Sequence, residues 1–225
     1  MTSEIAMRLS GFFFLFIIAA SIVGRILGYK LDNYDAVAKL QSISGAPAKF
    51  KISVLLLLVE HAGIIALCIS LFVAFGTCNV ALGIVWVVAR TGEGLLHAYS
   101  EIGYWGLLKL AAQYSVGGDV DGKALADAGR AVLQTKNLRF SQAMVLFGVG
   151  TLAYSIVFVS YGVVPVFVGW AGIVVGGLDV IGSGLRLAKP KIVAVAYLGG
   201  ALTLVFEIVI GVWLLVASSI IPCSG

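Results

Sequence analysis

The sequence predicts an all-α polytopic membrane protein, a six-transmembrane-helix bundle, and two observations carry this prediction. Hydrophobic residues make up 60% of the 225 residues and charged residues only 12%, and the mean hydropathy is +1.07. Soluble domains carry about a quarter charged residues and less than half apolar ones. The apolar residues also gather in runs of about 20, the length of helix that crosses a hydrocarbon core of about 30 Å. A water-soluble fold is therefore excluded.

Six such runs divide the chain and predict a single transmembrane domain over residues 1–225. The runs cover residues 9–28, 52–75, 79–110, 140–161, 164–187 and 192–218. They show no alternation of polar and apolar residues, which excludes the strands of a membrane β-barrel. The third run is longer than a span needs, so we expect it to tilt or to project from the membrane at its 104–110 end.

Basic residues are distributed unevenly among the connections. The segments after the first, third and fifth runs hold ten of them, whereas the opposite side has only Arg8. The ten are Lys30, Lys39, Lys49, Lys51, Lys123, Arg130, Lys136, Arg139, Lys189 and Lys191. Because cytoplasmic loops carry an excess of Lys and Arg, we expect a multi-pass protein of the cell membrane with both termini outside.

Two connecting segments have helical periodicity. In 34–44, Val37, Leu40 and Ile43 fall on one helical face, which suits a short helix on the inner membrane surface as well as it suits a solvated loop. In 123–136, the spacing of Leu125 and Val132 favours a second amphipathic piece.

Ionisable residues inside the predicted spans are the candidates for a functional site, because each costs about 2.5–3.5 kcal/mol to insert. Several of them share one face of the 79–110 helix, where Arg90, Glu93, His97 and Glu101 follow at intervals of three, four and four. The candidate residues of a buried polar core or ligand site are Glu60, His61, Arg90, Glu93, His97, Asp179 and Glu207.

The depth of these groups follows from the helical rise of about 1.5 Å per residue. Most of the deep charges fall in one layer that extends from the midplane into the inner half of the membrane, while Glu207 lies further out. The layer contains Glu60, Arg90, Glu93 and Asp179.

Two interpretations of the polar core stay open. In the structural one, Arg90 pairs with Glu93 and Glu60 and pins two helices together. In the functional one, the acids outnumber the single deep arginine, so some must be protonated or balanced by an imidazolium, a cation or an amine ligand. His61 and His97 could bind a metal with nearby carboxylates, but their spacing does not establish a convergent site, so no metal or cofactor is predicted.

Cysteines and glycines predict further contacts. Cys78 and Cys223 both fall on the outer side of this topology, where conditions are oxidising, so we expect a Cys78–Cys223 disulfide. Two pairs of glycines at i, i+4 spacing are helix-packing signals, either inside the bundle or with a membrane-protein partner or a second copy. They are Gly24 with Gly28 and Gly172 with Gly176.

Three segments resemble a known family. They are Val88-Ala89-Arg90-Thr91-Gly92-Glu93, the stretch 154–170 with its short turn Gly162-Val163-Val164-Pro165, and the stretch 206–216 that begins Phe206-Glu207. Together they resemble the uncharacterised six-helix bacterial membrane proteins grouped as domain of unknown function 4386. The resemblance implies the six-helix fold and topology over most of the chain. It implies no activity.

No motif in the sequence names a reaction. It contains no phosphate-binding glycine loop, no cysteine pair at metal spacing, no nucleophile elbow and no basic strip suited to nucleic acid. The loops are too short for a soluble catalytic layer, so we favour a non-enzymatic binding module or an accessory subunit of a membrane assembly, although enzymatic activity stays open. The alternatives are a proton-coupled small-molecule transporter and a membrane-embedded enzyme that uses the Glu/His face of the 79–110 helix.

Overall fold

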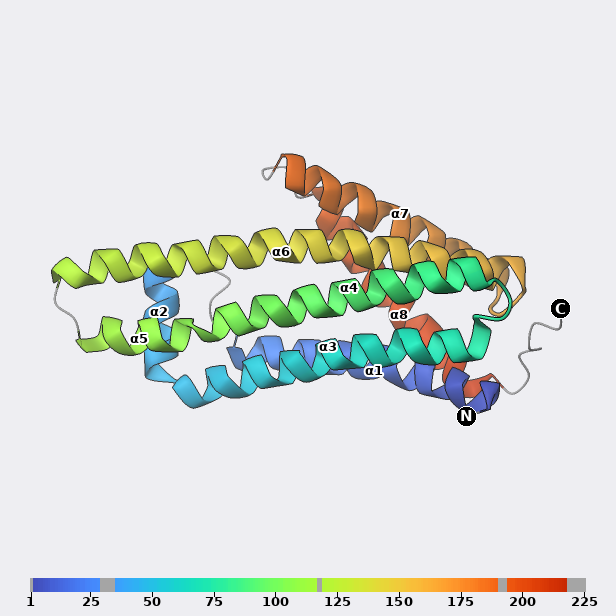
Figure 1. Cartoon of the computed structure of the whole chain (residues 1–225), viewed down its shortest axis with the longest axis horizontal. Coiled ribbons are helices and arrows are strands. Elements are labelled where there is room, and N and C mark those ends of the chain that lie inside the picture. Colours follow the sequence, from blue (N-terminus) through green and yellow to red (C-terminus); the bar gives the residue numbers. More distant parts are fainter. Residues whose placement is uncertain (1, 29–34, 117–118, 190–193, 218–225) are drawn as a thin grey trace. The chain divides into compact units, whose positions relative to one another are not determined.

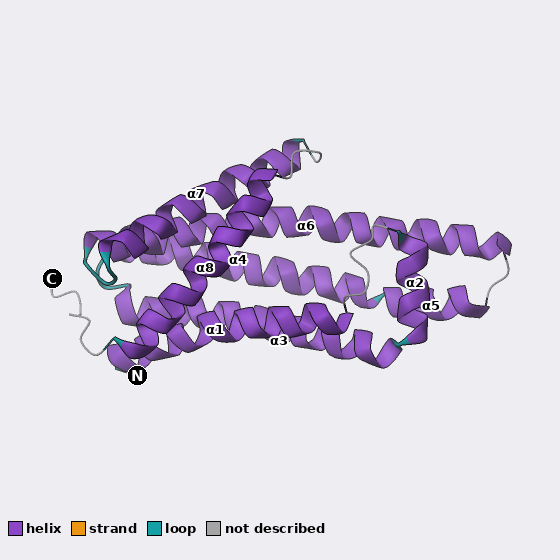
Figure 2. Cartoon of the chain, turned by 180° about the vertical axis from the view of Figure 1, so that it is seen from behind, coloured by secondary structure: helices purple, strands orange, loops and turns teal. Residues whose placement is uncertain are grey.

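The computed structural model describes residues 2–28, 35–116, 119–189 and 194–217, and these residues form eight α-helices and no strand (Figures 1 and 2). Their bounds are α1 Ser3–Gly28, α2 Ala36–Gly45, α3 Pro47–Phe75, α4 Val80–Trp105, α5 Leu107–Val116, α6 Asp119–Ser160, α7 Val166–Ala188 and α8 Ala194–Val216. Six helical segments are long and apolar enough to cross a membrane. The all-α fold class and the six predicted spans are confirmed.

Two predicted spans have different ends in the structure. The 79–110 run is divided into α4 and α5 at Gly106, whose backbone N–H bonds to the carbonyl of Gly103 at 3.1 Å. The 140–161 run is instead the second half of α6, which begins at Asp119 and includes the amphipathic segment 123–136. Residues 130–147 contain neither Gly nor Pro, so nothing in that stretch interrupts the helix.

The segment 34–44 forms a helix rather than a loop. The side chain of Asp35 accepts a hydrogen bond from the Val37 backbone N–H at 3.0 Å and so caps the first turn of α2. Leu40 and Ile43 are buried, as the apolar face predicts. Lys39 is buried with them, which the amphipathic pattern does not predict.

The turn between α6 and α7 requires a glycine. Gly162 has a φ of 64°, a backbone conformation that residues with a Cβ rarely adopt. The Val163 N–H then bonds back to the carbonyl of Phe158 at 3.0 Å, which satisfies one of the last carbonyls of α6. Pro165 follows as the N-cap of α7. This geometry agrees with the turn predicted at 162–163.

The chain divides into two compact units. Unit 1 contains Met1–Ile18, His61–Leu95 and Ser141–Gly225, and unit 2 contains Ala19–Glu60 and Leu96–Phe140. Each unit has its own apolar core. The core of unit 1 includes Phe14, Leu67, Trp86, Tyr154 and Ile210. The core of unit 2 includes Leu40, Phe50, Val54, Tyr104 and Leu107.

Helices in unit 1 approach one another closely at glycines. A Cβ on Gly176 of α7 would lie 2.9 Å from the carbonyl oxygen of Gly148 in α6, and a Cβ on Gly172 would collide with the Ser155 side chain. In unit 2, Gly24 of α1 packs against Leu57 of α3. The described contacts of these glycines are therefore within the chain, and an oligomer formed through Gly24, Gly28, Gly172 and Gly176 stays a prediction.

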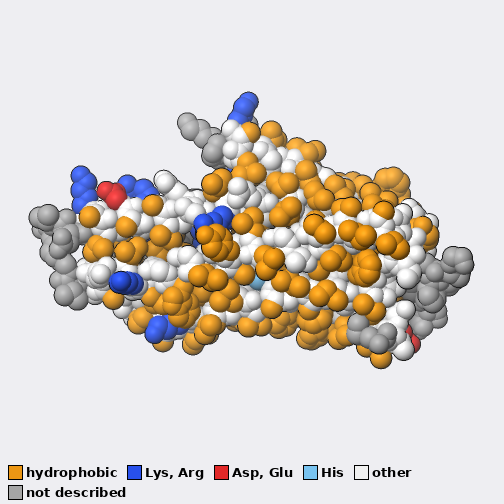
Figure 3. Space-filling model, in the orientation of Figure 1, with side chains coloured by type: hydrophobic (Ala, Val, Ile, Leu, Met, Phe, Trp, Pro, Cys, Tyr) orange, Lys and Arg blue, Asp and Glu red, His pale blue; other side chains and the backbone are white. Residues whose placement is uncertain are grey.

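Apolar side chains are also numerous on the outer surface. Figure 3 shows hydrophobic groups over much of the visible face, and the exposed ones include Val88 of α4, Phe167 of α7 and Val205 of α8. In water such a surface would be an aggregation hazard, whereas lipid tails solvate it. The protein is a multi-pass membrane protein.

The predicted Cys78–Cys223 disulfide falls partly on residues that the structure does not describe. Cys68 is a buried free thiol in α3, and Cys223, the expected partner of Cys78, lies outside the described residues. The prediction assumed that the 76–78 turn and the C-terminal tail are neighbours, and the positions of cysteines along a sequence cannot establish such proximity.

Adjacent glycines in α7 give a matched test of the packing. Gly176→Ala should lower the thermal unfolding midpoint in detergent, because the new methyl group meets backbone atoms of α6 and overpacking costs about 1–3 kcal/mol. Gly177→Ala is the control, because a Cβ there has no atom within 4 Å. It should leave the midpoint unchanged or raise it slightly. Equal destabilisation by both variants would contradict the close approach of α6 and α7.

Candidate functional site

Arg90 lies at the centre of the polar groups of unit 1. Its side chain leaves α4 and runs along α6, where the absence of a side chain at Gly150 makes room for it: a Cβ there would lie 2.7 Å from Arg90 Cγ. The Phe147 ring of α6 also lies 4.5 Å from the guanidinium carbon. Arg90 is only 1% exposed, so its charge must be compensated within the protein.

Two carboxylates supply that compensation. Arg90 Nη1 lies 2.9 Å from Glu93 Oε2, one turn further along α4, and Arg90 Nη2 lies 3.8 Å from Glu207 Oε1 of α8. Arg90 Nη1 and Glu93 Oε2 are close enough for an ion pair, but their geometry is not that of a hydrogen bond. The predicted pairing of Arg90 with Glu93 is confirmed. The contact with Glu207 links α4 to α8 within unit 1.

Asp179 is the third buried carboxylate of unit 1. It is 1% exposed, and its Oδ2 accepts a hydrogen bond of 2.6 Å from the Thr203 hydroxyl of α8. Gly199, one turn before Thr203, leaves room for the carboxyl group, since a Cβ there would lie 2.6 Å from Asp179 Oδ1. No Lys, Arg or His among the described residues lies within 4.0 Å of this carboxylate. Its described partner is therefore a neutral hydroxyl.

Tyr154 of α6 adds a hydroxyl to the same unit. Its side chain is fully buried, and its hydroxyl donates to Thr151 Oγ1 at 3.3 Å. The ring stacks on Phe206, the residue before Glu207, with 6.4 Å between ring centroids. Neither Tyr154 nor Thr203 was among the candidates, because a single Tyr or Thr in an apolar run carries no sequence signal of its own.

The other predicted residues do not join this group. His61 is buried at the start of the part of α3 that belongs to unit 1. A Cβ on Gly94 of α4 would lie 3.1 Å from the His61 carbonyl oxygen, so the two backbones are close there. Glu60 and His97 belong to unit 2. Glu60 is buried, and His97 is half-buried with its ring 5.6 Å from that of Phe140. The face shared by Arg90, Glu93 and His97 in the sequence is thus divided between the two units.

The position of Glu207 differs from the prediction. Counting residues from the membrane surface placed it outside the layer of Arg90, yet the two side chains pair at 3.8 Å. A depth counted from the helical rise holds only for a helix parallel to the membrane normal. In both views α8 crosses the helices of unit 1 obliquely (Figures 1 and 2), and an oblique helix changes depth less per residue.

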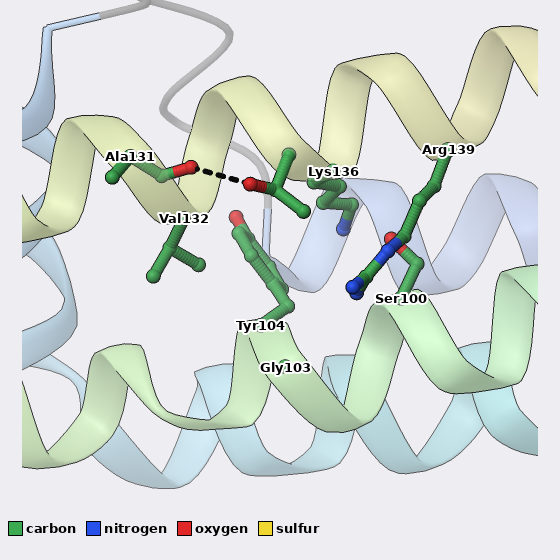
Figure 4. A pocket seen from close by; sticks show the side chains of 8 residues that line it. Ser100, Gly103, Tyr104, Ala131, Val132, Lys136 and Arg139 are labelled. Atoms are coloured by element: carbon green, nitrogen blue, oxygen red, sulfur yellow. Dashed lines mark hydrogen bonds between the residues drawn. The ribbon is translucent and has the colours of Figure 1, made fainter.

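Unit 2 contains a second charged cluster that the sequence prediction missed. Lys136 Nζ of α6 lies 2.8 Å from Glu101 Oε1 of α4 and 3.5 Å from the centre of the Tyr104 ring. Lys39 of α2 approaches the same ring at 5.4 Å. Figure 4 shows Tyr104, Lys136 and Arg139 around a pocket between α4 and α6. The periodicity of 123–136 is the available signal, although the sequence pattern counts Lys136 only among the basic residues of a cytoplasmic segment.

Metal-ligating groups do not converge in the described residues. Among them, no three His, Cys, Asp or Glu side chains lie close enough together to hold a metal ion.

Comparison with known proteins gives one match. No curated protein and no solved structure is significantly similar to the chain. The family model described as Domain of unknown function (DUF4386) matches residues 9–217, which include most of the first span, the other five spans and every residue of the polar core. The segments around Arg90, the 162–165 turn and Glu207 thus fall within the matched region. The chain belongs to the DUF4386 family of membrane proteins.

Proposed function

We propose that the protein is a non-enzymatic binding module of the cell membrane, acting alone or as an accessory subunit of a membrane assembly. The ligand we propose for it is a small cation, held at the carboxylates of the polar core. The observation that carries this proposal is Asp179, a buried carboxylate whose described partner is the neutral hydroxyl of Thr203. Burying an ionised carboxylate without a positive partner is costly, and a bound cation removes much of that cost.

The charges of unit 1 support a cation rather than an anion. Its described core contains one guanidinium, that of Arg90, and three carboxylates, those of Glu93, Asp179 and Glu207. Arg90 lies in ion-pair contact with two of the three. An anionic ligand would add to the excess of negative charge, whereas a small cation would reduce it.

Burial favours binding over catalysis at this core. A general acid or base must come within hydrogen-bonding reach of a substrate. Arg90, Glu93 and Asp179 are each at most 3% exposed and are held by neighbouring side chains, which leaves little access for anything larger than a small ion. These contacts suit a preorganised binding site.

Replacement of Asp179 tests the cation site. In detergent at constant ionic strength, replacing N-methylglucamine by sodium, potassium, ammonium or ethylammonium should raise the unfolding midpoint for at least one ion. Stabilisation by a ligand at 100 times its Kd is about 2.7 kcal/mol. Asp179→Asn should abolish the shift, because the amide keeps an acceptor for Thr203 but carries no charge.

Asp127→Asn is the matched control. Asp127 pairs with Arg130 on the exposed surface of α6, so its replacement should leave the ion response intact. A wild-type midpoint that no ion changes, or an unchanged response in Asp179→Asn, would contradict the proposal. Coupled uptake of the ion and a second solute into vesicles would instead assign a transporter, and a stoichiometric partner chain in the purified protein would assign the accessory role.

We further propose that both termini lie outside and that segments 29–51, 111–139 and 188–191 face the cytoplasm. The support is the ten Lys and Arg residues in these segments against Arg8 on the other side. Much of the first two segments is helical, in α2, α5 and the first half of α6, so the basic residues there are presented on ordered elements.

Cysteine labelling tests this orientation. In a variant whose native cysteines are replaced by serine, Lys123→Cys should resist a membrane-impermeant thiol reagent in intact cells and react after lysis. Thr77→Cys, in the turn between α3 and α4, should react in intact cells. Prompt labelling at position 123 together with protection at position 77 would reverse the orientation.

A further inference from the structure

The pocket in unit 2 lies outside the polar core and has the opposite charge. It is a cavity of about 210 Å³ between the end of α4 and the first half of α6, lined by Ser100, Tyr104, Thr135, Lys136 and Arg139 among others (Figure 4). Drug-sized ligands occupy pockets of about 300–1,000 Å³. This cavity suits a smaller group.

Two cations line the cavity. Lys136 directs one N–H toward Glu101 Oε1, and its ammonium group also lies over the Tyr104 ring, so one of its three donors remains. The guanidinium of Arg139 lies 4.2 Å from the centre of the Tyr99 ring. No carboxylate among the described residues lies within 4.0 Å of Arg139. The planar fork of Arg139 therefore has donors available for an anion.

Neighbouring charges leave the cavity positive. Glu101 neutralises one cation, and Glu60 lies within electrostatic reach of Lys136. Four basic groups oppose these two acids. Lys136 and Arg139 line the cavity, Lys39 lies near the Tyr104 ring, and Arg25 acts electrostatically on Lys136. Among the described residues, the cations that line the cavity, lie near Tyr104 or act on Lys136 outnumber the anions by two.

Ser100 gives an independent indication of a ligand. It is 4% exposed, lines the cavity, and its hydroxyl has no hydrogen-bond partner among the described residues. Thr135, on the opposite wall, instead bonds its hydroxyl to the Ala131 carbonyl at 2.9 Å. A buried hydroxyl without a partner is destabilising, because it has lost its hydrogen bonds to water without replacing them. A ligand oxygen that accepts from Ser100, Lys136 and Arg139 together would satisfy it.

We propose that this cavity binds a phosphate group through Ser100, Lys136 and Arg139. Phosphate offers several acceptor oxygens and negative charge to the guanidinium fork and the ammonium group. Two sources share this chemistry, the headgroup of an anionic phospholipid and free phosphate. Ten of the 15 basic residues of the chain belong to unit 2, and the orientation proposed above places that unit beside the anionic cytoplasmic leaflet.

Thermal unfolding of the purified full chain in detergent separates the two sources. Dioctanoyl phosphatidylglycerol is compared with dioctanoyl phosphatidylcholine, and sodium phosphate with sodium chloride at equal ionic strength. A midpoint raised only by phosphatidylglycerol assigns a lipid headgroup, and one raised by inorganic phosphate assigns the free anion. Equal responses to the two lipids, with none to phosphate, would overturn the site.

Variants link the response to the cavity. Arg139→Gln should weaken binding about tenfold or more, because it removes a hydrogen bond to a charged group. Arg130→Gln is the control, since Arg130 lies on the same helix, is exposed and pairs with Asp127. Ser100→Ala should weaken binding without lowering the midpoint of the ligand-free protein, since its hydroxyl has no partner to lose. Equal binding by Arg139→Gln and Arg130→Gln would refute the assignment.

Discussion

A guanidinium that is almost completely buried in a helix bundle can remain charged only if carboxylates surround it. Arg90 meets this condition through Glu93 on its own helix and Glu207 on α8. The contacts of α4 in unit 1 follow from it. Gly150 gives the arginine its space on α6, Phe147 covers its face, and Glu207 brings α8 into ion-pair contact with α4. An apolar residue at position 90 would not need a carboxylate partner on α4 or α8.

The buried charged groups of unit 1 and the described charged groups around the cavity of unit 2 have opposite excess charge. In unit 1, acids outnumber Arg90, and Asp179 is bonded to a hydroxyl, which is why a cation is the ligand we propose there. In unit 2, basic groups outnumber Glu60 and Glu101 around a cavity that contains the unpartnered hydroxyl of Ser100, which favours an anion. In both units the described contacts compensate the desolvation of buried polar groups only in part.

The sequence predicts what local patterns determine. Hydropathy finds six spans, and spacing along one helix finds the pairing of Arg90 with Glu93. Contacts between helices depend on tilt and register, which a single sequence does not record. For this reason the pairing with Glu207 and the cluster around Lys136 escaped prediction. The length of α6 was missed because basic residues at 123–139 were taken to mark a connection, although a helix continues through them.

The central claim is that Arg90 holds α4 and α8 together through Glu207, and a double-mutant cycle measures this coupling directly. Unfolding free energies in detergent are compared for Arg90→Leu, Glu207→Leu and the double variant, with the exposed Arg8→Leu as reference. We predict that Arg90→Leu costs about 3–5 kcal/mol, that Arg8→Leu costs under about 1 kcal/mol, and that the double variant costs clearly less than the sum of its single changes. Additive effects, or equal losses for Arg90→Leu and Arg8→Leu, would contradict the account.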